Sequence, residues 1–304
     1  MKSFQVWVQA CRLQTLPLAA ASIIVSGGLA YQQQSFNLSI FLLSLLTALL
    51  LQILSNLAND YGDAATGADD VRIGPKRAMQ SGIITVSAMK KAIWIALLVC
   101  MVSGLSLLTT SFGSNLQQWL IFLGLGLAAI IAAITYTMGK IPYGYKAMGD
   151  LSVFIFFGLL GVLGSFYLQT LTLSQEIILP AVSMGLFSAA VLNVNNMRDV
   201  YIDKAANKIT LVVLLGRNRA FQYHLIILAL AMFCAALYIY ILPNSAPWQY
   251  LFLLTASPLI KSCTQINQAI KEDVREGDIF NQQLKNTAMS TFVFSILFSL
   301  VLIT

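Results

Sequence analysis

The chain has 304 residues, of which 58% are hydrophobic and only 10% are charged, and its formal net charge is +6. Water-soluble domains carry about 25% charged residues, so this composition excludes a soluble globular protein. We therefore predict an integral membrane protein that is built from transmembrane helices.

Stretches without a charged residue mark the predicted membrane-spanning helices. Three stretches are long enough for two helices each, at residues 13–59, 92–139 and 220–260. Three more suffice for one helix each, at residues 151–175, 177–197 and 286–304. Each long stretch is interrupted near its middle, at Gln32-Gln33-Gln34, Gly113-Ser114-Asn115 and Pro243-Asn244-Ser245. The pattern predicts an all-α membrane bundle of about nine helices, in a single domain that covers residues 1–304.

The basic residues predict how the chain is oriented. With nine spans, all 18 Lys and Arg residues fall on one side of the membrane, and the other side carries a single charge, Glu176. Lys and Arg collect in cytoplasmic loops. We therefore expect a multi-pass protein of the inner (plasma) membrane with a cytoplasmic amino terminus and an external Thr304.

Two acidic clusters lie where predicted spans two and six reach the cytoplasmic face. Asp60 and Asp63 are three residues apart, and Asp199 and Asp203 are four apart, so each pair shares one face of a helix. Asparagines accompany both pairs, namely Asn56, Asn59, Asn195 and Asn196. A lone pair of this kind is usually a solvated helix end, but two pairs among only 12 acids favour two Mg²⁺ sites. Mg²⁺ is held by one or two carboxylates and completes its shell with water and substrate phosphate.

Basic residues near both clusters suit a phosphate-containing ligand. They are Arg72, Lys76, Arg77, Lys140, Arg198 and Lys208. Arginine forks and lysine point charges both bind phosphate, so the sequence predicts a site for a metal-bound diphosphate. The later acidic stretch at residues 272–278 lacks the asparagines and is predicted to be a solvated loop.

Three motifs, in this order, resemble the signature of the UbiA superfamily of intramembrane prenyltransferases, and the resemblance covers nearly the whole chain. They are Asn59-Asp60-x-x-Asp63, Tyr136-x-x-x-Lys140 and Asp199-x-x-x-Asp203. Gly67 stands where the usual first motif ends in Asp, and Asp69 follows. This variation is similar to the branch that prenylates 1,4-dihydroxy-2-naphthoate. Asn207 replaces a usual Gly before Lys208, and Asn tolerates left-handed backbone.

The resemblance implies a UbiA-like bundle with a polar cavity that faces the cytoplasm. It also implies Mg²⁺-dependent transfer of a polyprenyl group from polyprenyl diphosphate to 1,4-dihydroxy-2-naphthoate, with loss of CO₂ and diphosphate to give demethylmenaquinone. The expected partners are these two substrates and the lipid bilayer, with no nucleic acid and no obligate protein partner.

The resemblance also implies a role for each candidate residue. Asp60 and Asp63 are expected to hold one Mg²⁺ and Asp199 and Asp203 the other, with Asn56 or Asn59 as a neutral oxygen ligand. The six basic residues named above are expected to bind the diphosphate, and Tyr136 to orient Lys140 or the phosphate. Asp150 is expected either to assist proton loss from the acceptor or to pair with Lys146 one turn away.

Aromatic side chains are candidates to stabilise the allylic cation that forms when diphosphate leaves. They are Tyr143, Tyr145, Phe154, Phe156 and Phe157, although each is as readily explained by packing. His224, the only histidine, is expected near the membrane interface, and a histidine metal site is not expected.

Other classes of protein fit part of the pattern. A sibling prenyltransferase acting on 4-hydroxybenzoate, homogentisate or haem would share the metal motifs and differ in its acceptor pocket. A secondary transporter would bind its solute near the bilayer midplane, whereas these acids lie at the predicted cytoplasmic helix ends.

Overall fold

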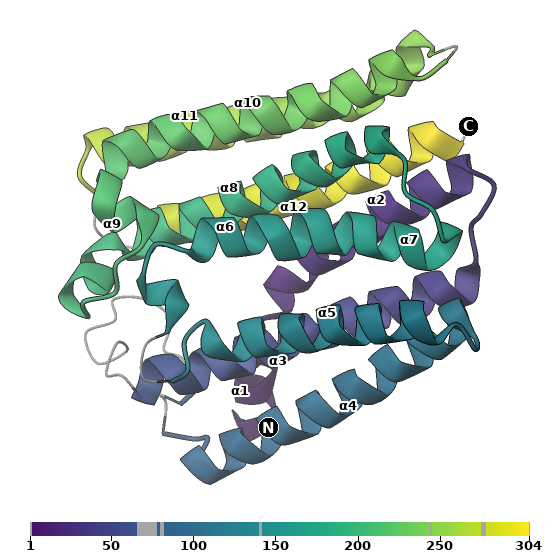
Figure 1. The fold of residues 1–304 in the computed structure, drawn as a ribbon. Helices are drawn as coiled ribbons and strands as arrows, with labels where there is room; N and C mark the ends of the chain where they lie inside the picture. The colour runs from purple at the N-terminus through teal and green to yellow at the C-terminus, as the bar shows by residue number, and fades with distance from the viewer. Residues whose placement is uncertain are drawn as a thin grey trace.

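The computed structural model describes residues 2–65, 78–79, 82–139, 142–243, 245–274 and 278–303, and these residues form a helical bundle (Figure 1). The α-helices are α1 (Lys2–Ala10), α2 (Leu16–Gln32), α3 (Leu38–Ala65), α4 (Val86–Phe112), α5 (Leu116–Thr135), α6 (Gly149–Val153), α7 (Ser165–Thr170), α8 (Ile178–Ala205), α9 (Leu211–Leu215), α10 (Arg217–Ile241), α11 (Ala256–Lys271) and α12 (Asp278–Ile303). Between them lie the 3-10 segments η1 (Leu13–Thr15), η2 (Tyr143–Tyr145), η4 (Gln175–Ile177) and η5 (Pro247–Thr255), and the π-helix η3 (Phe154–Gly164).

Eight segments of the described chain are long and apolar enough to cross a membrane. They are Phe4–Gln32, Leu38–Ala65, Val86–Phe112, Leu116–Thr135, Gly149–Thr170, Gln175–Ala205, Arg217–Ile241 and Ile279–Ile303. The predicted all-α membrane bundle is thus confirmed. The ninth expected span corresponds to η5 and α11, which form one continuous helical segment beside α12. This segment is not among the eight because α11 buries Leu259 and Ile266 on one side and carries exposed polar residues on the other.

The three predicted interruptions separate helices as expected. Gln33 and Gln34 lie between α2 and α3, and α10 ends at Ile241, just before the third interruption. Between α4 and α5, Gly113 adopts a φ of 54°, a left-handed value that suits glycine. Asn115 then caps α5, because its side chain accepts a hydrogen bond of 3.2 Å from the Gln118 amide.

Two of the five hydrophobic clusters of the described helices form the main apolar units. One unit joins α1, α3, α4 and α5 around Leu54 and Met89, and the other joins α2, η3, α8, α10 and α12 around Phe187 and Phe294. In Figure 1, α12 runs along α2 and α10 along α8. The backbones of η3 and α8 approach closely, since a Cβ on Gly158 would lie 2.6 Å from the Cα of Gly185. Small residues at such crossings are typical of membrane helices.

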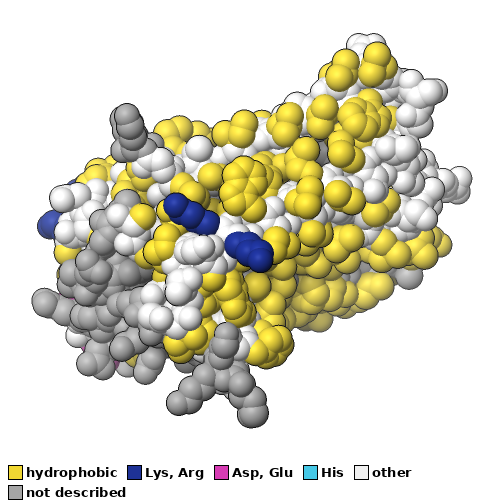
Figure 2. Space-filling view, turned by 90° about the horizontal axis from the view of Figure 1, so that it is seen from below, with side chains coloured by type: hydrophobic (Ala, Val, Ile, Leu, Met, Phe, Trp, Pro, Cys, Tyr) yellow, Lys and Arg dark blue, Asp and Glu magenta, His cyan; other side chains and the backbone are white. Residues whose placement is uncertain are grey.

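Hydrophobic side chains cover most of the described surface in the view of Figure 2. The few basic side chains visible there lie toward the end of the bundle that carries α9. Exposed Trp94, Leu98 and Val102 continue this apolar surface along α4. A surface of this kind requires lipid around it, so the chain is a multi-pass membrane protein.

Candidate active site

Both acidic pairs lie at the same end of the bundle and face inward. Asp60 and Asp63 stand in the last two turns of α3 and are 1% and 2% exposed. Asp199 and Asp203 stand in the last two turns of α8 and are 7% and 5% exposed. Spacings of three and four residues therefore place each pair on the buried face of its helix, as predicted. Carboxylates this deeply buried need compensation by hydrogen bonds or opposite charge.

The first pair is held by the segment that follows α5. The Tyr145 hydroxyl donates a hydrogen bond of 2.7 Å to Oδ1 of Asp63. The Thr137 hydroxyl lies 3.0 Å from Oδ1 of Asn59. Gly62 allows this approach, since a Cβ there would lie 2.6 Å from Oγ1 of Thr137. The end of α3 is thus fixed against residues that lie about eighty positions later in the chain.

The second pair carries its own basic partners. The guanidinium of Arg198 forms a two-pronged ion pair with Asp199, in which Nε donates to Oδ1 and Nη2 to Oδ2, both at 2.7 Å. Nζ of Lys208 lies 3.4 Å from Oδ1 of Asp203. Oδ2 of Asp203 is buried and has no hydrogen-bond partner among the described residues. This oxygen is therefore open to a ligand from outside the protein.

A tight turn after α8 places Lys208 beside Asp203. Asn207 adopts a φ of 54°, so the expected tolerance of asparagine for left-handed backbone is used here. The amide of Lys208 then donates a hydrogen bond of 2.8 Å to the Asp203 carbonyl. The turn thus fixes the lysine relative to the carboxylate through the backbone as well as through charge.

The two acidic pairs meet through Tyr145. The loop after α5 and the loop after α8 form a short parallel bridge between Lys146 and Ile209. Across it, the Ile209 amide donates to the Tyr145 carbonyl at 3.2 Å. Nζ of Lys208 lies 5.4 Å from the centroid of the Tyr145 ring, whose hydroxyl binds Asp63. One side chain therefore contacts the first pair and also the lysine of the second.

Tyr136 lies between the two pairs. Burial, together with the nearby carboxylates of Asp150, Asp63 and Asp203, raises the pKa of the Tyr136 hydroxyl far above its ordinary value. Its ring is closely enclosed, since a Cβ on Gly149 would lie 2.7 Å from the hydroxyl oxygen. The raised pKa favours the protonated hydroxyl, which can donate a hydrogen bond.

Asp150 is 7% exposed and lies beside the hydroxyl of Tyr223 on α10, while its Oδ1 is buried and has no hydrogen-bond partner among the described residues. The neighbour expected from the sequence, Lys146, instead takes part in the backbone bridge with Ile209. Asp150 thus belongs to the buried polar network of the site, and its partner comes from a different helix.

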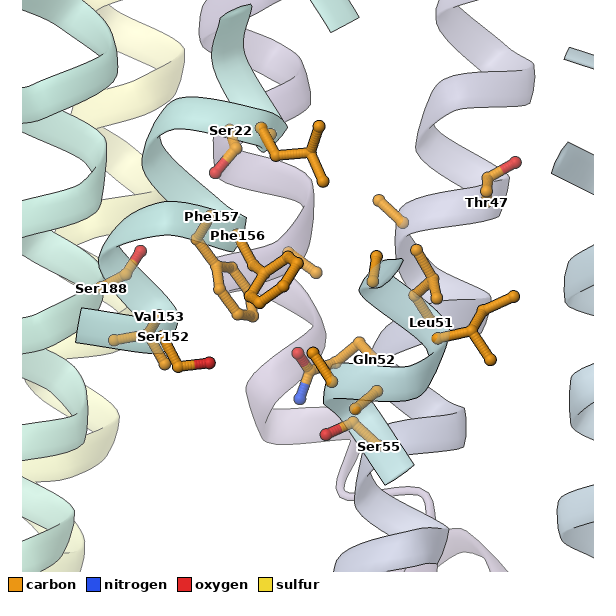
Figure 3. Close-up of a pocket in the computed structure, with 18 of the residues that line it drawn as sticks. Ser22, Thr47, Leu51, Gln52, Ser55, Ser152, Val153, Phe156, Phe157 and Ser188 are labelled. Carbon is orange, nitrogen blue, oxygen red and sulfur yellow. The ribbon is translucent and has the colours of Figure 1, made fainter. Parts of the chain in front are cut away.

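A cavity of about 420 Å³ opens beside these residues, between the two apolar units. Its polar end is lined by Asn56, Asn59, Tyr136, Asn195, Asn196, Arg198 and Lys208. The rest of its wall is mainly apolar and follows α3 from Asn59 back to Ser44, which is about 22 Å at 1.5 Å per residue. Figure 3 shows Phe156 and Phe157 of η3 facing Leu51 and Gln52 of α3 across this space. The shape suits a long apolar molecule with an anionic head.

Residues 20–276 match the UbiA prenyltransferase family. The chain belongs to this family. It is 46% identical to the 1,4-dihydroxy-2-naphthoate octaprenyltransferase of Escherichia coli (strain K12), over 95% of this chain and 94% of that protein. It is 44% identical to the protein of the same name from Haemophilus influenzae, over 85% of this chain and 84% of that protein.

Solved structures of the family show the same fold. A UbiA homologue from Aeropyrum pernix K1 aligns with a TM-score of 0.64 at 17% identity, over 91% of this chain and 96% of that one. A UbiA homologue from Archaeoglobus fulgidus, bound to GPP and Mg²⁺, aligns with a TM-score of 0.61 at 18% identity, over 96% of this chain and 99% of that one. The resemblance inferred from the three motifs is thereby confirmed.

Some predicted site residues lie outside the described part of the chain. They are Arg72, Lys76, Arg77 and Lys140, together with Gly67 and Asp69 of the variant first motif. Among the aromatic candidates, Tyr143, Phe156 and Phe157 line the cavity. Phe154 instead packs against Gly185 of α8.

The two motif asparagines of α3 use their amide groups within the protein. Asn56 donates to the Cys11 carbonyl at 2.9 Å and lies 3.0 Å from Oγ1 of Thr15, while its oxygen accepts from Gln52 at 3.1 Å. Asn56 therefore ties the start of α2 to α3 at the wall of the cavity. The oxygen of Asn59 likewise accepts a hydrogen bond from Thr137.

Three residues near the site were not predicted from the sequence to belong to it. Tyr223 lies beside Asp150, Asn281 of α12 accepts a hydrogen bond of 2.9 Å from Arg198, and Arg12 lines the cavity. The sequence predicted Arg12 only to be one of the cytoplasmic basic residues. Its position one residue before the first long uncharged stretch is the feature that could have indicated a place at the end of the first span.

Proposed function

We propose that this protein transfers a polyprenyl group from polyprenyl diphosphate to 1,4-dihydroxy-2-naphthoate, with loss of CO₂ and diphosphate, to give demethylmenaquinone. The observation that carries the proposal is the convergence of two buried carboxylate pairs through Tyr145, directly behind Asn59, Arg198 and Lys208, which line an elongated apolar cavity. The choice of acceptor rests on the two relatives from E. coli and H. influenzae, whose names specify the naphthoate.

The donor set of the site fits divalent magnesium. Among the described residues, no three His, Cys, Asp or Glu side chains come together as a complete protein ligand set. Mg²⁺ normally keeps water and binds substrate phosphate besides one or two carboxylates, so a carboxylate pair is a sufficient protein contribution. We assign one ion to Asp60 and Asp63 and a second to Asp199 and Asp203, where Oδ2 of Asp203 is available. When bound, the ions neutralise the diphosphate and stabilise it as a leaving group.

The basic residues hold the diphosphate end of the donor. Arg198 and Lys208 line the polar end of the cavity, and we assign Lys140, Arg72, Lys76 and Arg77 to the same role from their motif positions. Tyr136, which stays protonated, donates a hydrogen bond to the same head group. The isoprenoid tail lies along the apolar wall, where each buried methylene contributes about 0.8 kcal/mol.

Transfer breaks the bond between the allylic carbon and the diphosphate oxygen, and the electron pair leaves with the diphosphate. The rings of Tyr143, Phe156 and Phe157 line the cavity and shield the resulting cation from water. The carboxyl-bearing ring carbon of the acceptor forms the new carbon–carbon bond. Loss of CO₂ then returns its bonding electrons to the ring and gives the hydroquinone form of the product, so the transfer itself needs no oxidant. Molecular oxygen in the buffer then removes two electrons and two protons and gives demethylmenaquinone. We assign Asp150 to accept the acceptor hydroxyl proton and to return it.

We further propose that the described helices and the connecting residues act as one domain, residues 1–304, in the inner (plasma) membrane. All 18 basic residues fall on one side of the predicted topology, which supports a cytoplasmic amino terminus and a site that faces the cytoplasm.

An acceptor screen tests this function. The purified full-length protein, in detergent or nanodiscs, is given a radiolabelled polyprenyl diphosphate with 1,4-dihydroxy-2-naphthoate or 4-hydroxybenzoate, with Mg²⁺ or with EDTA. We expect labelled demethylmenaquinone only with the naphthoate and Mg²⁺. Product from 4-hydroxybenzoate alone would overturn the acceptor assignment and leave a sibling prenyltransferase. Full turnover in EDTA would overturn the metal assignment.

A further inference from the structure

Arg198 and Asp199 are adjacent in α8, and yet their side chains form an ion pair with two bonds of 2.7 Å. Neighbouring residues on a helix point about 100° apart and do not normally face each other. The long arginine side chain therefore bends back to reach the carboxylate. The pair is largely buried, with side-chain exposures of 12% for Arg198 and 10% for Asp199.

Two asparagines hold the arginine in this bent position. Nη2 of Arg198 donates to Oδ1 of Asn195, one turn earlier on α8, at 2.8 Å. Nη1 donates to Oδ1 of Asn281, at the start of α12, at 2.9 Å. Three acceptors from two helices thus fix the guanidinium against both oxygens of Asp199. Side chains from two helices therefore fix the position of Arg198, and one of these helices, α12, carries none of the three sequence motifs.

The same two oxygens are the ones that a divalent cation would need. A metal ion bound to Asp199 would have to approach the oxygens on which the positive guanidinium already lies, and like charges at this distance in a buried site repel strongly. Arg198 also lines the polar end of the cavity, so a rotation of its long side chain would bring the fork to an anion there. Arginine forks bind phosphate as readily as carboxylate.

We propose that Arg198 is an exchangeable counter-charge: it neutralises Asp199 in the empty site and transfers to the diphosphate when a metal ion takes its place. This proposal rests on the proposed function, since it takes the head of the substrate to be a diphosphate. It predicts that metal and diphosphate bind cooperatively at the second acidic pair. It also explains why α12 and Asn195 supply hydrogen-bond acceptors to an arginine that stands next to a carboxylate.

The test measures Mn²⁺ binding, by the loss of the free-ion electron paramagnetic resonance signal, to the full-length protein in phosphatidylcholine nanodiscs. Without diphosphate, Arg198→Gln should bind Mn²⁺ about tenfold more tightly than the wild type, because the competing charge is gone. With saturating geranyl diphosphate the effect of the substitution on Mn²⁺ affinity should reverse, so that Arg198→Gln binds Mn²⁺ more weakly than the wild type does. Lys204→Gln, which removes an exposed cation of α8 close by, should behave as the wild type in both conditions.

Asn281→Ala provides a second variant that leaves both charges in place. Loss of one hydrogen bond to Arg198 should tighten Mn²⁺ binding without diphosphate about threefold, and this result decides the question if Arg198→Gln does not fold. The double variant Arg198→Gln/Asp199→Asn lacks the carboxylate as well as the competing cation, so it should bind Mn²⁺ no more tightly than the wild type.

The proposal is overturned if Arg198→Gln binds Mn²⁺ no more tightly than the wild type without diphosphate, or if no variant binds Mn²⁺. Naphthoate prenylation by the wild type is measured separately. If the wild type prenylates the naphthoate but Arg198→Gln does not change Mn²⁺ binding, only the proposed exchange of Arg198 is rejected. If Arg198→Gln strengthens Mn²⁺ binding without diphosphate and weakens it with diphosphate, but the naphthoate is not prenylated, only the proposed acceptor is rejected.

Discussion

The two acidic pairs differ in how the protein balances their charge. Asp199 and Asp203 have cationic partners from α8 and the turn directly after it, Arg198 and Lys208. Among the described contacts, Asp63 accepts a hydrogen bond from the Tyr145 hydroxyl, which belongs to the loop after α5. The described partners of the second pair thus lie close to it in the chain, whereas this contact of the first pair joins distant segments. The difference teaches that similar motifs at the ends of two helices can be held by contacts of very different range along the chain.

The largest effects should come from removing a carboxylate of either pair. Asp63→Ala and Asp203→Ala should each reduce the turnover number roughly a thousandfold, because each removes a ligand from a site that stabilises the leaving group. Excess Mg²⁺ should recover part of the loss. The measurement is the initial rate of product formation at increasing Mg²⁺. A matched control is Glu176→Ala, the charge predicted on the opposite side, which should retain full activity.

The ion pair of Asp203 should be visible in stability as well as in activity. Asp203→Ala leaves Lys208 at the polar end of the cavity without its carboxylate, 3.4 Å away in the native protein. The alanine variant of Asp203 should therefore show a lower thermal unfolding midpoint than the wild type. An unchanged midpoint would show that this ion pair does not stabilise the fold.

Tyr145→Phe should give the next largest effect, because it breaks the hydrogen bond from the Tyr145 hydroxyl to Asp63 while it keeps the ring under Lys208. A hydrogen bond to a charged group contributes about 1.5–3 kcal/mol, so we expect a loss in kcat/KM of roughly 10- to 100-fold. The loss should lie mainly in KM for the prenyl diphosphate. Tyr143→Phe, in the same short segment, is the control. A fall in kcat alone for Tyr145→Phe would count against a binding role.

Tyr223→Phe should have a smaller effect that concerns the acceptor. The Tyr223 hydroxyl lies beside Asp150 and touches neither acidic pair in the described contacts. We expect kcat to fall roughly 3- to 10-fold, as for the loss of one polar neighbour, with KM for the prenyl diphosphate unchanged. Steady-state kinetics with both substrates varied will check this. A change confined to the prenyl diphosphate KM would remove Asp150 from the acceptor chemistry.

The sequence predicted the features that local chemistry determines. Charge-free runs and their interruptions gave the helices, and spacings of three and four residues predicted that Asp60 and Asp63, and Asp199 and Asp203, share one helix face. The structure adds that both faces are buried. Such patterns depend on residues close together in the chain, which a single sequence records directly.

Contacts between distant segments could not be predicted in this way. Nothing in the sequence pairs Tyr145 with Asp63 or Asn281 with Arg198, which are 82 and 83 residues apart. His224, which was expected near the membrane interface, is fully buried among the helices, and its position in the sequence did not show this. α10 is apolar on nearly all sides, so its sequence does not show which face packs against α8.

The smallest effect should come from the turn that distinguishes the second pair. Asn207 has a φ of 54° between Asp203 and Lys208, where a side chain with a Cβ is strained by about 1–2 kcal/mol and asparagine less so. Asn207→Ala should therefore lower the free energy of unfolding by about 1 kcal/mol, seen as a lower thermal midpoint. Asn207→Gly should equal or exceed the wild type, because glycine adopts this backbone freely. If Asn207→Gly were less stable than the wild type, the asparagine side chain, rather than the backbone conformation at residue 207, would hold Lys208 beside Asp203.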